Sequence, residues 1–192
     1  MAPTPARPVR ERILAAAGEA FYREGIRAVS ADKIIAAAGT TKVTFYRYFP
    51  TKDNLVEAYL DQQSERIREA AGKLPDDPCR ALAALAQAMG DETCRPGFRG
   101  CPFINAAAEY PEADHPVRIA VARHRDWFRA LVADLAGRLG AQNPGLVADQ
   151  LIMLRDGAMV HGYVADPRLV GDSLLQAGGA VLKQHVPGIG QA

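Results

Sequence analysis

The sequence has few of the residues that build disulfide frameworks, metal sites or hydrolytic centres. Its three cysteines, Cys79, Cys94 and Cys101, form an odd and irregularly spaced set. That spacing disfavours both a disulfide framework and structural zinc. The four histidines are scattered and include no HExxH or comparable pair, so no metal-dependent enzyme is indicated. We therefore expect no cofactor, no metal ion and no catalytic residues.

Long apolar runs are missing as well. No run approaches the length needed to cross a bilayer, and the N-terminal residues 1–8 hold no hydrophobic signal core. We expect a cytoplasmic protein with no membrane partner and a disordered, proline-rich arm over residues 1–8. The chain also lacks strict period-two alternation and internal repeats, and these absences favour an all-α fold.

Glycine and proline divide the rest of the chain into predicted helices. Ile13, Ala17 and Phe21 are spaced four residues apart and predict an amphipathic helix that ends at Gly25. A longer helix is expected to begin at Lys52 with Thr51 as its cap. Further helices are predicted at roughly 31–38, 41–48, 78–92, 102–110, 115–139, 144–165 and 168–185.

The segment from Gly39 to Lys52 combines a helix start, aromatic side chains and cations. Gly39 stops one short helix, and Thr40 or Thr41 can cap the next. On that next helix Phe45 and Phe49 share one face. A helix of two turns cannot hold itself together, so its neighbours must carry it. The pattern predicts a helix-turn-helix embedded in three helices.

The other face of this helix carries lysine, threonine, tyrosine and arginine. Such side chains suit a DNA groove, because cations reach phosphates or guanine edges and hydroxyls donate to phosphate. A solvated polar face is the alternative explanation. Charge favours DNA: residues 1–52 hold 9 Lys/Arg against 4 Asp/Glu, whereas residues 53–192 hold 14 against 18. A basic head on an acidic body is expected of a protein that meets a phosphate backbone.

Residues 13–60 resemble the DNA-binding domain of the TetR family of bacterial transcriptional regulators. The resemblance rests on "I-L-x-A-A…F…G" from Ile13, "V-S…I-A-A-A-G" from Val29 and "T-K-V-T-F-Y-R-Y-F-P-T-K-D-N-L" from Thr41. It implies a helix-turn-helix DNA-binding domain over residues 9–52 and a connecting helix over 53–71. A ligand-binding and dimerisation domain over 72–192 is expected to follow.

The resemblance also implies which residues contact double-stranded operator DNA. Lys42, Val43 and Arg47 match positions that face base edges, with Thr41 at the entry of the helix. Arg47 can pair with guanine O6 and N7, and Val43 can touch a thymine methyl group. Positions that contact phosphate are matched by Ser30, Thr44, Tyr46, Tyr48 and Lys52.

A second distinctive phrase runs from Phe98 to Pro111. Pro102 suits the first turn of a helix and leaves Cys101 at its cap, where the helix dipole would lower a thiol pKa. A cysteine-based redox or electrophile sensor is therefore one alternative, and a small buried hydrophobe is the other interpretation of Cys101. For an unknown small-molecule effector we expect a site drawn from Cys101, Phe103, Asn105, Trp127, Phe128, Met153 and Met159.

The last two predicted helices carry apolar faces and many glycines. Glycine inside a helix costs about 1 kcal/mol relative to alanine, so close approach of backbones is a reasonable explanation. The resemblance implies a homodimer through residues 146–185. The sequence thus predicts a ligand-responsive regulator, most simply a repressor released from a palindromic operator. An enzyme using Cys101 with His124 is disfavoured, because no third orienting group stands at a diagnostic spacing.

Overall fold

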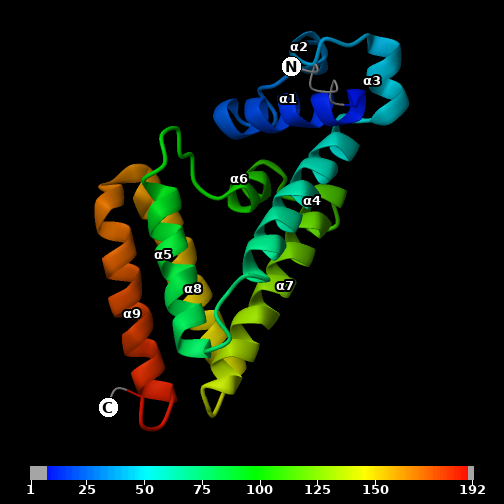
Figure 1. Ribbon diagram of the computed structural model, residues 1–192. Helices are drawn as coiled ribbons and strands as arrows, with labels where there is room; N and C mark the ends of the chain where they lie inside the picture. Colours follow the sequence, from blue (N-terminus) through cyan, green and yellow to red (C-terminus); the bar gives the residue numbers. More distant parts are fainter. Residues whose placement is uncertain (1–7, 190–192) are drawn as a thin grey trace, which may run out of the picture. The chain divides into compact units, whose positions relative to one another are not determined.

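The computed structural model describes residues 8–189, and every regular element in this part of the chain is a helix (Figure 1). This confirms the predicted all-α class. None of the helices within residues 8–189 is both long enough and apolar enough to cross a bilayer. The predicted disordered arm lies outside the described residues except for Pro8. The elements are α1 (Val9–Glu24), α2 (Ala31–Ala37), α3 (Lys42–Tyr48), α4 (Lys52–Ala71), α5 (Pro78–Thr93), α6 (Pro102–Glu109), α7 (Pro116–Arg138), α8 (Pro144–Val164), a 3₁₀ turn η1 (Pro167–Leu169) and α9 (Val170–His185).

The described residues group into two compact units. The first contains residues 8–66 and 102–121, and the second contains residues 67–101 and 122–189. The first unit therefore includes α6, which follows α4 and α5 in the chain. The boundary predicted at residue 72 had placed α6 in the later domain.

In the first unit α1, α2 and α3 pack against one another. The predicted inward face of α1 is buried, with Ile13, Ala17 and Phe21 all in the core. The Phe21 ring meets the ring of Tyr59 from α4 edge-on, at a centroid distance of 5.9 Å. This geometry is favourable for aromatic pairs and fixes the start of α4 against α1.

Hydroxyl caps begin three helices of the first unit, including those that the sequence predicted before α3 and α4. The Oγ of Ser30 accepts a hydrogen bond from the backbone N–H three residues on, at 3.3 Å. Thr41 and Thr51 do the same at 3.2 and 3.1 Å. Each cap satisfies one of the N–H groups that a helix start leaves without a partner. Thr41, rather than Thr40, is the cap of α3.

In the second unit α5, α8 and α9 pack against one another (Figure 1). Two of these helices begin with a side-chain cap followed by proline. Asp77 and Asn143 accept from the backbone N–H three residues on, at 2.8 and 3.1 Å, and Pro78 and Pro144 follow them. Proline suits this position because its missing N–H would have no helical partner.

The last helix differs from its predicted span of 168–185. The carboxylate of Asp166 accepts from the N–H of Arg168, only two residues on, at 3.0 Å. This closes the tight turn η1, and the α-helix itself begins at Val170. The tighter turn follows from the short cap and the fixed φ of Pro167.

Glycines allow close contacts between helices of the second unit. A Cβ built on Gly90 of α5 would lie 2.7 Å from the backbone Cα of Gly171 in α9. A Cβ on Gly162 of α8 would lie 2.5 Å from the side chain of Thr93. Among the glycines of the last helices, close contact thus explains Gly162, whereas a Cβ at Gly171 would stand at an ordinary 3.6 Å from the Cα of Gly90. At Gly157 and Gly179 the corresponding space is open.

Alanine at position 90 is therefore expected to destabilise the protein. Because a backbone atom of Gly171 cannot rotate away, Gly90→Ala should lower the free energy of unfolding by about 1–3 kcal/mol. Gly178→Ala is the matched control, since its Cβ would stand 3.5 Å from a leucine methyl group. It should leave stability unchanged or raise it by up to about 1 kcal/mol. Urea unfolding followed by circular dichroism measures both, and equal effects would refute the close contact.

Candidate nucleic-acid interface and ligand cavity

The two-turn helix α3 has one buried and one exposed face. Phe45 and Phe49 are in the core, and their ring centroids lie 6.4 Å apart. On the other side Val43 is 82% exposed, and Lys42 and Arg47 are also exposed. Val43 is therefore exposed between two cations, where its methyl groups are free to contact a partner surface.

The turn before α3 is held from α1. Gly39 has a φ of +58°, a left-handed conformation that favours glycine. The guanidinium of Arg12 donates from Nη2 to the carbonyl of Gly39 at 3.3 Å. α1 therefore fixes the angle at which α3 leaves the turn.

The start of α4 is tied to the loop between α1 and α2. The Nζ of Lys52 donates to the carbonyl of Arg27 at 3.4 Å. Burial lowers the pKa of the Lys52 ammonium below its ordinary value, although the nearby carboxylates of Glu109 and Asp53 favour the charged form. Lys52 is thus both a cation at the helix start and a part of the packing around the loop.

The same loop is held by Glu109, the last residue of α6. Its Oε1 accepts from the N–H of Ile26 at 2.8 Å, and its Oε2 accepts from the N–H of Arg27 at 2.6 Å. Hydrogen bonds to a carboxylate are stronger than those between neutral groups. Two N–H groups that donate to the same carboxylate fix the orientation of the loop as well as its distance from Glu109. Glu109 lies within the distinctive phrase from Phe98 to Pro111, and its two partners are more than 80 positions away in the sequence.

Tyr110 extends this contact toward α4. Its hydroxyl donates to Asp53 Oδ1 at 3.3 Å, and His115 Nε2 lies 3.6 Å from Asp53 Oδ2. Burial and the nearby Asp53 carboxylate raise the pKa of Tyr110 to about 12, so the phenol stays protonated and donating at neutral pH. Tyr110 and His115, which follow α6, thus both contact Asp53, the neighbour of Lys52 at the start of α4.

The predicted DNA-contact residues lie on the exposed face of α3 and at the starts of three helices of the first unit. Lys42, Val43, Tyr46, Arg47 and Tyr48 are exposed on α3, and Thr44 is partly exposed. The remaining three occupy helix starts: Ser30 at α2, Thr41 at α3 and Lys52 at α4. Backbone N–H groups and cations therefore occur together there, as in phosphate-binding surfaces.

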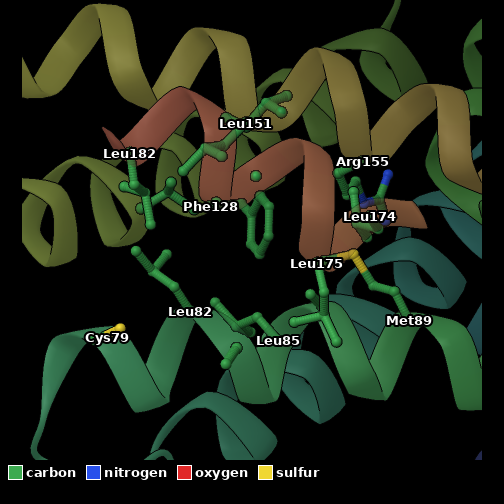
Figure 2. Close-up of a pocket in the computed structure, with 16 residues that line it drawn as sticks. Cys79, Leu82, Leu85, Met89, Phe128, Leu151, Arg155, Leu174, Leu175 and Leu182 are labelled. Carbon is green, nitrogen blue, oxygen red and sulfur yellow. The ribbon is translucent and has the colours of Figure 1, made fainter. Parts of the chain in front are cut away.

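The second unit contains a cavity of about 200 Å³ bounded by α5, α7, α8 and α9 (Figure 2). Leucine, alanine and glycine dominate its lining, with Phe128 contributed by α7. One charged residue, Arg155, lines it. Its residues are Cys79, Leu82, Ala83, Leu85, Ala86, Met89, Phe128, Val132, Leu151, Ile152, Arg155, Leu174, Leu175, Gly178, Gly179 and Leu182.

Of the seven residues predicted for an effector site, Phe128 lines this cavity and the other six do not. Met153 is 65% exposed, whereas Cys101, Phe103 and Met159 are buried. Trp127 and Asn105 are partly buried. Trp127 remains close to the cavity, because its ring centroid lies 6.1 Å from that of Phe128. Arg155 lines the cavity, although it was not among the seven predicted residues, and Met153 does not.

An apolar stripe on α8 is left in solvent. Leu146, Met153 and Val160 recur every seven residues and are 43%, 65% and 50% exposed. Gly157, between the last two, has open space where a side chain would stand. Leu151 and Leu174, by contrast, line the cavity, and Leu174 is buried. Exposed apolar stripes of this kind are typical of interaction surfaces.

Comparison with known proteins places these features in a family. Residues 13–59 match the family described as bacterial regulatory proteins, tetR family. The crystal structure of a TetR-family transcriptional regulator from Streptomyces coelicolor has 42% sequence identity and a TM-score of 0.87, covering 92% of this chain and 95% of that chain.

Two curated relatives match over shorter segments. The HTH-type transcriptional regulator YvkB of Bacillus subtilis is 40% identical over 117 residues, 56% of this chain and 62% of the relative. An HTH-type transcriptional regulator of Mycobacterium tuberculosis is 27% identical over 141 residues, 71% of this chain and 66% of the relative. The chain thus spans just under two thirds of the length of these curated relatives.

The similarity to the Streptomyces coelicolor regulator extends well beyond the helix-turn-helix, since it covers more than nine tenths of both chains. A capped recognition helix with an exposed cationic face is the feature by which such proteins bind DNA. The chain belongs to the TetR family, whose members are DNA-binding transcriptional regulators and not enzymes.

Proposed function

We propose that this protein is a ligand-responsive repressor that binds a palindromic operator as a homodimer and is released by a small molecule. The observation that carries the proposal is the two-sided helix α3. Its phenylalanines are buried, and its cations, hydroxyls and Val43 face solvent. With its phenylalanines buried, α3 can place its exposed face in the major groove of DNA.

Within that groove Arg47 and Lys42 would face base edges and Val43 a thymine methyl group. Arg47 is suited to guanine, because its planar fork can donate to O6 and N7 together. Thr41 would lie at the entry to the groove. Phosphate contacts are assigned to Ser30, Thr44, Tyr46, Tyr48 and Lys52, which supply hydroxyls, a cation and the N-terminal amides of α2.

Dimerisation is proposed through residues 146–185, with the exposed stripe of α8 at the centre. Leu146, Met153 and Val160 supply the apolar surface, and Gly157 lets a second backbone approach. A two-fold interface of this kind would present two copies of α3 to two half-sites. Leu151 and Leu174 also lie within residues 146–185, but they line the cavity, so a substitution there would disturb the cavity as well as the dimer.

The effector is proposed to occupy the apolar cavity of the second unit. Its volume of about 200 Å³ exceeds the ~150 Å³ of an engineered cavity that holds benzene. A ligand changes DNA affinity only as far as its own affinity differs between the two conformations. A thiol-based sensor is less well supported, since Cys101 is 3% exposed and reagents in solution would not reach its sulfur directly.

The first prediction separates base contacts from phosphate contacts. Arg47→Ala should cost about 1–3 kcal/mol on the specific site and relax base preference. Lys52→Ala should weaken binding to all duplexes and lower the salt slope by about one. Fluorescence anisotropy with specific and scrambled duplexes at several salt concentrations measures both. Unchanged affinity in both variants would contradict the assignment of this face to DNA.

The second prediction concerns Glu109 as a positioning residue. Glu109→Gln keeps the size of the side chain, but its neutral amide oxygen can accept only one of the two backbone hydrogen bonds and its NH2 group cannot accept the other. DNA affinity should fall roughly tenfold for all sequences, because the loop leads directly to Ser30. Glu112→Gln, an exposed neighbour, is the control. An altered base preference in Glu109→Gln, or equal loss in the control, would refute the role.

The third prediction concerns assembly. Met153→Glu should split the dimer, because an unpaired charge in a buried interface costs about 3–5 kcal/mol. Ala88→Glu on α5 adds the same charge to an exposed position and should leave assembly unchanged. Sedimentation velocity at micromolar concentration reports the result. A wild-type monomer that still binds a palindrome tightly would contradict the dimer.

The fourth prediction concerns release from DNA. Small, largely apolar molecules that quench or shift Trp127 fluorescence should also release the operator, and Cys101→Ser should respond as the wild type does. Ala86→Phe, which fills part of the cavity, should bind DNA but lose the response. If oxidants or electrophiles release wild-type protein but not Cys101→Ser, and no reversible ligand does so, the thiol is the sensor and the cavity is not.

A further inference from the structure

We propose that the cavity of the second unit takes a slim amphipathic carboxylic acid, with its carboxylate on the guanidinium of Arg155 and its apolar body along α5 and α9. The inference rests on the proposed function, since it names the chemical class of the effector. It is carried by the shape of the cavity, the free hydrogen-bonding edge of Arg155 and the charges around it.

The cavity is long relative to its volume. It is lined from Cys79 to Met89 on α5 and from Leu174 to Leu182 on α9, which at 1.5 Å per residue corresponds to roughly 12–15 Å of helix. A volume of about 200 Å³ spread over this length leaves a narrow space. An alkyl chain, or one ring with a short chain, fits such a space better than a broad polycyclic molecule.

Arg155 lies at one end of the cavity, near Leu174 and Met89, whereas Cys79 and Leu182 lie at the other end (Figure 2). The lining between the two ends is apolar. A ligand that fills the cavity would therefore meet a charge at one end only. A molecule with one ionised group at one end and an apolar body matches this distribution of charged and apolar lining.

The guanidinium of Arg155 is only partly used by the protein. Its Nη1 donates to Asp156 Oδ1 at 2.9 Å, and both Nη atoms donate to the sulfur of Cys101 at 3.4 Å. Its Nε is buried and has no hydrogen-bond partner among the described residues. A guanidinium has five N–H donors. The Nε–H and the second Nη2–H, which lie along one edge, make no hydrogen bond among the described residues, so a turn of the side chain that brings this edge to the cavity would let a carboxylate accept two parallel hydrogen bonds.

The surrounding charges also favour an anion. Asp156 is shared, because its Oδ2 accepts from Arg125 at 2.8 Å, so one carboxylate faces two guanidinium groups. Arg68, which lies over the ring of Trp127 at 4.2 Å, adds a third cation nearby. Burial, followed by Arg155, Arg68 and Arg125, lowers the pKa of His124 to about 4, so the imidazole is neutral at pH 7. An incoming carboxylate would supply the second negative charge that this group of two guanidiniums and one carboxylate lacks.

Calorimetric titration with decanoate and its neutral counterpart decanol, at one ionic strength and below micelle formation, tests the proposal. Wild-type protein should bind decanoate at least about tenfold more tightly than decanol. In Arg155→Gln this preference should disappear while the affinity for decanol is kept. Arg155→Lys, which keeps the charge but not the fork, should retain part of the preference. Arg168→Gln, on the exposed η1 turn, should behave as the wild type does.

Arg155→Gln is expected to fold, because Asp156 keeps its ion pair with Arg125. Thermal unfolding of the variant checks this, and Arg155→Lys supplies a second test if the glutamine variant is unstable. Equal affinity of wild-type protein for both ligands, a preference that survives in Arg155→Gln, or no binding of decanoate would each overturn the carboxylate assignment.

Release of operator DNA in the same titrations separates this inference from the proposed function. If decanol and decanoate bind equally and both release DNA, the ligand-responsive regulator stands and the assignment of Arg155 falls. If decanoate binds through Arg155 and DNA affinity does not change, the binding site stands and its role as the effector site falls.

Discussion

Burial of Phe45 and Phe49 is the interaction on which DNA recognition by this protein depends. The helix α3 has only seven residues and cannot be stable alone. Its two phenylalanines pack into the core of the first unit, and this packing determines which side chains face solvent. The turn at Gly39 and the hydrogen bond from Arg12 then set its direction. The outer face of α3 is therefore defined by what its inner face buries.

The DNA-binding unit is larger than a helix-turn-helix because α6 belongs to it. Glu109 holds two backbone N–H groups of the loop before α2, and Tyr110 donates to Asp53 beside the start of α4. Two of the proposed phosphate-binding positions, Ser30 and Lys52, thus adjoin segments that α6 holds. A displacement of α6 would therefore act on both positions at once.

The sequence predicted the helices well because local chemistry determines where they begin and end. Hydroxyl caps at Ser30, Thr41 and Thr51 and prolines at 78 and 144 act over three or four residues, so they can be recognised without a structure. The inward positions Phe45 and Phe49 follow from helical period in the same way. The two-unit grouping, with α6 in the first unit, depends on contacts far apart in the chain.

Other features were beyond sequence reasoning for the same physical reason. The partners of Glu109 are 82 and 83 residues away, and no local pattern encodes that distance. Helix α8 is apolar on several sides, so its periodicity does not say which leucines line the cavity and which side chains remain exposed. Leu151 proved to line the cavity and Met153 to lie in solvent. No local pattern predicts that the guanidinium of Arg155 contacts Cys101, which lies 54 residues away in the sequence.

Selection of binding sites from a random duplex library by the full-length protein tests the central claim most directly. The claim is that two copies of α3 read DNA together through their exposed faces. It predicts enrichment of a palindromic sequence whose half-sites are centred about one helical turn, or 10–10.5 base pairs, apart or a multiple of it. Loss of base preference within both half-sites is expected when Arg47→Ala protein is used. Failure to enrich any sequence, or enrichment of a single unrepeated site that Arg47→Ala selects equally well, would contradict the account.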